Sequence, residues 1–119
     1  MKRLIAAGVL AVIVAVVTVS GGILVSKTEK SVVSAAEDII NAPTAEKIEK
    51  FTLYWQKTAV PLSFFVNRES IEDIGKAAAK MTSAGKNNDR EEILESAEEI
   101  KYIIGHIAEQ GKFNLLSFF

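Results

Sequence analysis

The residues best suited to acid–base chemistry surround the single histidine of the chain. Glu99, Tyr102 and Glu109 lie at helical spacing from His106. Catalysis by such a group needs a base, an orienting acid and a nucleophile that converge in a pocket. The sequence has no second histidine, no cysteine, no G-x-S-x-G motif and no H-E-x-x-H motif. We therefore predict that His106 is a structural or surface residue and that the protein is not an enzyme.

Metal and nucleic-acid binding find equally little support in the composition. The chain has no cysteine, one histidine and a net charge of -1, so neither a thiolate zinc site nor a phosphate-binding surface is expected. Five glutamates between residues 91 and 99 form the largest charge feature, but no EF-hand spacing accompanies them. We interpret them as a solvated face rather than a site for calcium or a basic partner, and we expect no cofactor.

The N-terminal segment has the length and composition of a membrane span. Leu4–Val25 comprises 22 uncharged residues, and a helix of that length covers about 30 Å, the thickness of a hydrocarbon core. A cleaved signal peptide is the alternative, but its apolar region usually extends over only about 7–15 residues. We predict an uncleaved anchor within residues 1–25.

Charges that flank the span predict its orientation. Lys2 and Arg3 precede it without any acid, whereas Lys27 and Lys30 follow it together with Glu29. By the positive-inside rule, the N-terminus is cytoplasmic and the remainder of the chain is extracytoplasmic. The protein is thus expected in the cell membrane as a single-pass protein.

Small residues recur along one side of this span, at Ala7, Ala11 and Ala15. Small side chains at this spacing let two helices approach closely in lipid. The stripe is a candidate contact for a membrane-protein partner or for a second copy of the chain. The alternative is a span that is simply rich in alanine, glycine and valine.

The remainder of the chain reads as helical throughout. Residues 26–43 continue the helical pattern as a stalk that ends at Pro43, and residues 44–119 form a bundle of three or four helices. Thr44 is an expected N-cap, and Trp55 lies on an apolar stripe. Trp55 is expected in the core, together with Phe51, Phe64 and Phe65, and its alternative role is that of an interface anchor.

The last two predicted helices match as an antiparallel hairpin about residue 87. In this register Met81 opposes Ile93 and Ile74 opposes Ile100, while Lys80 lies near Glu95 as a flanking ion pair. Gly85 is the expected C-cap of the first helix of this hairpin. The predicted fold is therefore all-α, with one transmembrane helix followed by a small bundle that ends in an αα-hairpin.

The C-terminal heptapeptide is unusually apolar. Gly111 is expected to end the last helix, and five of the seven residues after Lys112 are Phe or Leu, including Phe118 and Phe119. Such a tail is buried by folding back over the bundle, inserts into the membrane surface, or docks on a partner. We favour folding back.

The layout resembles a bacterial family of short membrane-anchored proteins, the domain of unknown function numbered 4363. The resemblance is carried by Phe64–Asn67, Ser70–Ile74, Glu99–Ile107 and Asn114–Leu115. It implies a protein found mainly in Gram-positive bacteria, whose gene tends to lie beside one for a multi-span membrane protein. Family members often have histidine where this chain has Asn67, and because asparagine caps helices well, we interpret this position as an N-cap.

These patterns predict a non-enzymatic, single-pass accessory protein whose extracytoplasmic bundle binds another membrane protein or itself. The first alternative is a cell-envelope ligand-binding or sensing module with a pocket between helices near Trp55 and His106. A hydrolase that uses His106 with a glutamate is the weakest alternative.

Overall fold

A computed structural model shows four helices joined by short turns. It describes the backbone from residue 2 to residue 118 and the side chains from residue 2 to residue 110. The helices are α1 (Lys2–Asn41), α2 (Ala45–Leu62), α3 (Arg68–Lys86) and α4 (Arg90–Phe118). No strand occurs between residues 2 and 118, which confirms the all-α prediction.

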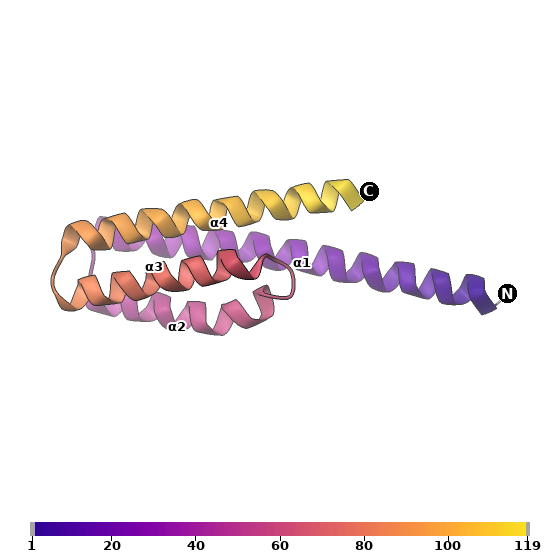
Figure 1. Ribbon diagram of the computed structural model, residues 1–119, viewed down its shortest axis with the longest axis horizontal. Coiled ribbons are helices and arrows are strands. Elements are labelled where there is room, and N and C mark those ends of the chain that lie inside the picture. The colour runs from indigo at the N-terminus through magenta and orange to yellow at the C-terminus, as the bar shows by residue number, and fades with distance from the viewer. Residues whose placement is uncertain (1, 119) are drawn as a thin grey trace.

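The four helices run alternately up and down (Figure 1). Helix α1 packs against α2 and α4, and α3 packs against the same two helices on the other side of the core. The molecule measures 66 × 22 × 20 Å, because α1 extends well beyond the other three helices. The turns that follow α1 and α3 lie at the end far from the N-terminus, and the α2–α3 turn lies at the near end.

Helix α1 consists of two parts with different surroundings. None of its described residues before Gly21 is buried, whereas one residue per turn is buried beyond that point. Val32, Ala36 and Ile39 are at most 2% exposed. Residues 26–41 therefore form the first helix of a four-helix bundle, which corrects the prediction of a stalk. The helix is continuous with the apolar segment, but its buried stripe packs on the other helices.

The helix starts follow the predicted caps. Thr44 Oγ1 accepts a hydrogen bond from the Lys47 backbone N–H (3.3 Å), and Asn67 Oδ1 accepts one from Glu69 (2.9 Å). Asp89 Oδ1 accepts from the Glu92 backbone N–H at 3.2 Å. Each side chain satisfies a backbone donor that the first turn of a helix leaves free. The capping interpretation of Asn67 is confirmed.

The end of α3 corrects the role given to Gly85. The helix continues to Lys86, and Asn88 adopts φ 53°. The Asp89 N–H donates to the Ala84 carbonyl (2.9 Å) and the Asn88 N–H to that of Gly85 (3.4 Å), as in a Schellman motif. Asparagine tolerates this left-handed conformation, so Asn88 ends the helix. At Gly85 a Cβ would lie 3.1 Å from Ile48 Cδ1, so this glycine permits close packing of α2.

The predicted hairpin of the last two helices is present. Helices α3 and α4 pack antiparallel, and Ile74, Met81, Ile93 and Ile100 are all buried. The expected ion pair between Lys80 and Glu95 is not formed. Among the described side chains, the ion pair that joins α4 to another helix is Lys101 Nζ–Glu37 Oε1 at 3.6 Å, and its partner lies on α1.

Helix α4 does not end at Gly111, as predicted, but continues to Phe118. A glycine within a helix costs only about 1 kcal/mol relative to alanine, so it does not by itself end a helix. The backbone of the C-terminal segment therefore does not fold back over the bundle. It extends along α1 in the direction of the N-terminus (Figure 1).

The burial of α1 in the bundle has a measurable consequence. Ile39 is 1% exposed, so we expect Ile39→Ala to lower the free energy of unfolding by about 2–5 kcal/mol. Ser34→Ala, on the exposed side of the same helix, should change it by less than about 0.5 kcal/mol. Unfolding in mild detergent, followed by circular dichroism and Trp55 fluorescence, measures both. Equal stability of the two variants would instead support the original prediction that this part of α1 is a free-standing stalk.

Candidate functional site

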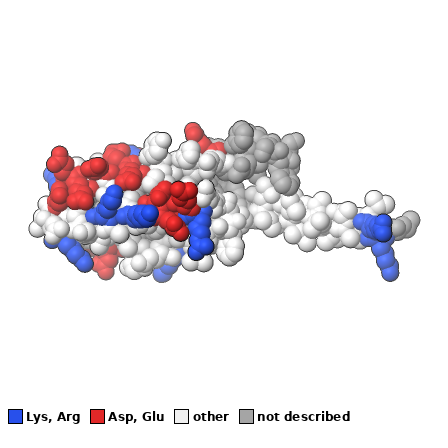
Figure 2. Space-filling model, viewed as in Figure 1, with Lys and Arg blue, Asp and Glu red and all other residues white. Residues whose placement is uncertain are grey.

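The projecting part of α1 holds the first candidate residues. Ala7, Ala11 and Ala15 are all exposed, and the large apolar residues around them are exposed as well, from Leu4 at 78% to Val19 at 50%. Figure 2 shows this part as an uncharged rod with basic residues at its tip, whereas acidic and basic side chains gather on the bundle. Among the described helices, α1 alone is long and apolar enough to cross a membrane.

The aromatic residues divide between the core and the surface. Phe51 and Trp55 are 3% and 4% exposed, as their stripe on α2 predicts. Phe64, however, is 79% exposed, so its expected place in the core is wrong. The chain turns directly after Pro61, and backbone hydrogen bonds from Phe65 and Val66 to the Leu62 carbonyl close this turn. Leu62 is fully buried, whereas the Phe64 ring faces outward.

Phe65 joins the α2–α3 turn to α1. A Cβ on Gly21 would lie 2.9 Å from Phe65 Cε1 and 3.0 Å from Phe65 Cγ, with Cδ1 closer still. Glycine is thus required for the ring to lie against the helix backbone. Sequence analysis missed this contact, because nothing in the local pattern pairs residue 21 with residue 65. The available signal in the sequence was the uncharged stretch from Thr58 to Asn67, which indicates a segment that packs on another apolar surface.

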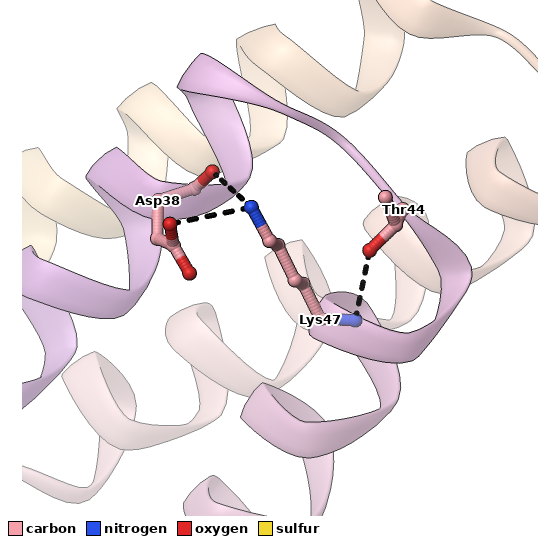
Figure 3. A network of polar contacts seen from close by, with 3 residues as sticks. All are labelled: Asp38, Thr44 and Lys47. Carbon is pink, nitrogen blue, oxygen red and sulfur yellow. Dashed lines mark hydrogen bonds and ion pairs between the residues drawn. The ribbon is translucent and has the colours of Figure 1, made fainter.

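The corner between α1 and α2 is closed by polar contacts (Figure 3). Lys47 Nζ donates to the backbone carbonyl (3.3 Å) and to the carboxylate (3.2 Å) of Asp38. A cation here interacts favourably with the C-terminal end of the α1 dipole. Beside it a groove of about 650 Å³ separates the two helices, lined by Ser31, Ala35, Asp38, Thr44, Glu46, Lys47, Lys50, Phe51 and Tyr54.

The remaining candidates for chemistry do not converge. His106 is exposed on α4, and neither it nor Trp55 lines the groove between α1 and α2. The glutamates of α4 at positions 91, 92, 95, 98 and 99 are also exposed. Within the described part of the chain, no three histidine, aspartate or glutamate side chains lie close enough together to hold a metal ion.

The structure keeps the predicted interaction residues apart. The alanine stripe lies on the projecting part of α1, while Trp55 lies inside the bundle. Helix α4 packs beside α1 and ends at Phe118, toward the N-terminal side of the bundle (Figure 1). The side chain of Phe118 and the whole of Phe119 lie outside the described residues.

Comparison with known families adds the identity of the domain. Residues 24–117 match the family described as "Domain of unknown function (DUF4363)". The chain belongs to the DUF4363 family. No match was found among curated proteins or among solved structures. The family resemblance carried by segments between residues 64 and 115 is thus confirmed and extended to Leu24.

The limits of the match agree with the structure. The DUF4363 region begins at Leu24, next to Val25, where α1 enters the core. It includes the buried stripe of α1 from Val25 to Ile39 and leaves out the residues before Leu24, of which Gly21 alone is buried among those described. The DUF4363 domain of this chain is therefore the complete four-helix bundle.

The contact between Gly21 and Phe65 can be tested by adding one methyl group. Gly21→Ala places its Cβ against the Phe65 ring, and overpacking of this kind costs about 1–3 kcal/mol. Gly75→Ala is the matched control, because a Cβ there meets nothing within 4 Å, and it should stabilise α3 by about 0.5–1 kcal/mol. Thermal unfolding in mild detergent compares the two. A Gly21→Ala variant as stable as Gly75→Ala would show that this contact is absent.

Proposed function

We propose that this protein is a non-enzymatic, single-pass membrane accessory protein whose extracytoplasmic bundle or anchor binds another membrane protein or a second copy of the chain. In this proposal residues 1–25 anchor the chain with the N-terminus in the cytoplasm. The DUF4363 bundle lies outside the membrane, and residues 26–43 belong to it. The protein resides in the cell membrane.

One observation carries the anchoring part of the proposal: an apolar helix most of whose side chains before Gly21 the bundle leaves uncovered. Between Leu4 and Val19 every side chain is exposed except those of Val14 and Thr18, which are half-buried. An uncovered apolar surface of this extent is unfavourable in water. In a bilayer the same surface is stabilised by lipid, and the helix satisfies its own backbone hydrogen bonds.

The proposed binding of a partner is supported by the exposed small residues of the anchor. Ala7, Ala11 and Ala15 stay free of the bundle and are available to another helix. Inside lipid, association depends on close van der Waals packing, which small side chains allow. The apolar C-terminal residues, Phe118 and Phe119 among them, are the second candidates for docking.

A ligand-binding module remains the second candidate function. The groove between α1 and α2 supports it, with Lys47, Lys50 and Asp38 as polar groups beside Phe51 and Tyr54. This groove differs from the pocket expected near Trp55 and His106. Recovery of the protein without any partner would favour this alternative.

The proposed orientation is tested by thiol labelling, because the chain has no cysteine of its own. Ser83 is exposed at the end of α3 that lies far from the anchor. We expect Ser83→Cys to react with a membrane-impermeant maleimide in intact cells, while the cysteine-free wild type does not react. Labelling that appears only after lysis would place the bundle in the cytoplasm.

The proposed helix contact is tested by substituting the stripe. Ala7, Ala11 and Ala15 are changed together to leucine, which keeps the span apolar but prevents close approach of a partner helix. After crosslinking in native membranes and solubilisation in mild detergent, wild-type protein should recover a stoichiometric membrane partner or a second copy. The triple variant should lose it.

The matched control changes Val9, Ile13 and Val16, on the opposite side of the span, to leucine. This control should retain the partner. Loss of the partner in both triple variants, or in neither, would contradict a contact through the alanine stripe.

A further inference from the structure

The end of the bundle nearest the projecting helix has an uncharged, apolar edge. Thr58–Asn67 contains no charged residue, and Val60, Phe64 and Phe65 within it are 66%, 79% and 37% exposed. We call Val60, Phe64 and Phe65 the apolar edge. Single exposed apolar residues are common on proteins, but here three large apolar side chains within six residues are exposed at one end of the bundle.

This edge lies beside the membrane-spanning segment and not beyond its end. Phe65 packs on Gly21, and Gly21 lies four residues inside the uncharged stretch that ends at Val25. At 1.5 Å per residue, four residues correspond to a depth of about 6 Å. Apolar side chains of interfacial segments insert about 5–10 Å into the boundary between headgroups and acyl chains.

Charged residues of both signs lie on the bundle side of the same edge: the exposed Arg68 and Glu69 begin α3, and two lysines lie on α1 and α2. Lys27 follows Gly21 by six residues on α1, and Lys57 precedes Phe65 by eight residues on α2, which runs antiparallel to α1. Both lysines are exposed. Lysine side chains at this height can extend to lipid phosphates while the apolar groups below them lie in the acyl region.

We infer that the apolar edge inserts into the extracytoplasmic headgroup layer of the membrane that α1 crosses, as a second membrane contact of the bundle. This inference rests on the proposed anchor. The occupant is lipid because the edge is joined to the span by the Phe65–Gly21 contact and lies within its apolar length. A contact at two places, the helix and the turn, would prevent the bundle from tilting freely about α1.

The experiment uses the full-length, cysteine-free chain with one thiol at a time. Phe64→Cys carries an environment-sensitive NBD fluorophore, with Val60→Cys as a second reporter on the same edge. The variants are reconstituted into vesicles of phosphatidylcholine and phosphatidylglycerol that contain nitroxide lipids, labelled either near the headgroup or deep in the acyl chain. Circular dichroism verifies that each labelled variant keeps its helices, as the exposure of both side chains predicts.

Two matched controls separate this inference from the proposed anchor. Ser83→Cys reports on the end of the bundle far from the membrane, and Ile13→Cys, 53% exposed, reports on the middle of the span. If α1 spans the bilayer, deep nitroxides quench the label at residue 13. The expected result at residues 64 and 60 is a blue-shifted emission and severalfold stronger quenching by shallow nitroxides than at residue 83.

Three other results overturn the inference. Quenching at residue 13 together with water-like, unquenched emission at residues 64 and 60 leaves the anchor in place but shows that the edge faces water. A blue shift at residues 64 and 60 without quenching by either nitroxide shows that protein covers the edge. Absence of quenching at residue 13 rejects the proposed anchor, and with it the membrane contact.

Discussion

Helix α1 has to satisfy two different surroundings without a break in its backbone. Up to Ser20 every described side chain is at least partly exposed, and from Gly21 onward one side of the helix is buried. The helix has no proline before Pro43 and no kink-forming residue at the point of change other than Gly21–Gly22. Since a continuous helix transmits rotation and tilt directly, the direction of the projecting segment determines how the other three helices are presented.

The packing of α1 in turn depends mainly on α4. The two helices lie side by side over most of the bundle, and the Lys101–Glu37 ion pair joins their exposed sides. This pair is partly solvated and contributes little stability, so the apolar stripe provides most of the adhesion. Elsewhere small residues bring helices close together, as alanines 77, 84 and 97 do between α3 and α4 and Gly85 does beside Ile48.

The distribution of charge is consistent with the proposed location. Acidic and basic residues lie together on the bundle, which favours solubility there without a strongly charged surface of one sign. The projecting helix is uncharged between Arg3 and Lys27. The apolar edge and the C-terminal part of α4 both lie at the end of the bundle nearest this helix. The same end also carries the exposed residues Arg68, Glu69 and Glu72 at the start of α3, so it combines an apolar edge with charges of both signs.

Local signals in the sequence determined the helices themselves. The capping side chains of Thr44, Asn67 and Asp89 act within three residues of their own position, so their role is readable without tertiary information. The α3–α4 hairpin was predictable for a related reason, because a short turn fixes the register in which two apolar stripes oppose each other. The uncharged span was evident from length and composition alone.

Contacts between residues far apart in the chain were decided only by the tertiary structure. The periodicity of residues 26–41 indicates an apolar stripe on one side of the helix. It does not show whether this helix stands alone as a stalk or packs against the other helices of a bundle. The same limit applies to Phe64 and Phe65. The sequence does not tell which of two adjacent aromatic rings faces α1, and only the tertiary structure shows that Phe65 packs on Gly21. Gly111 and Gly85 were misjudged as helix ends, since whether a glycine ends a helix depends on the neighbours that hold the next turn.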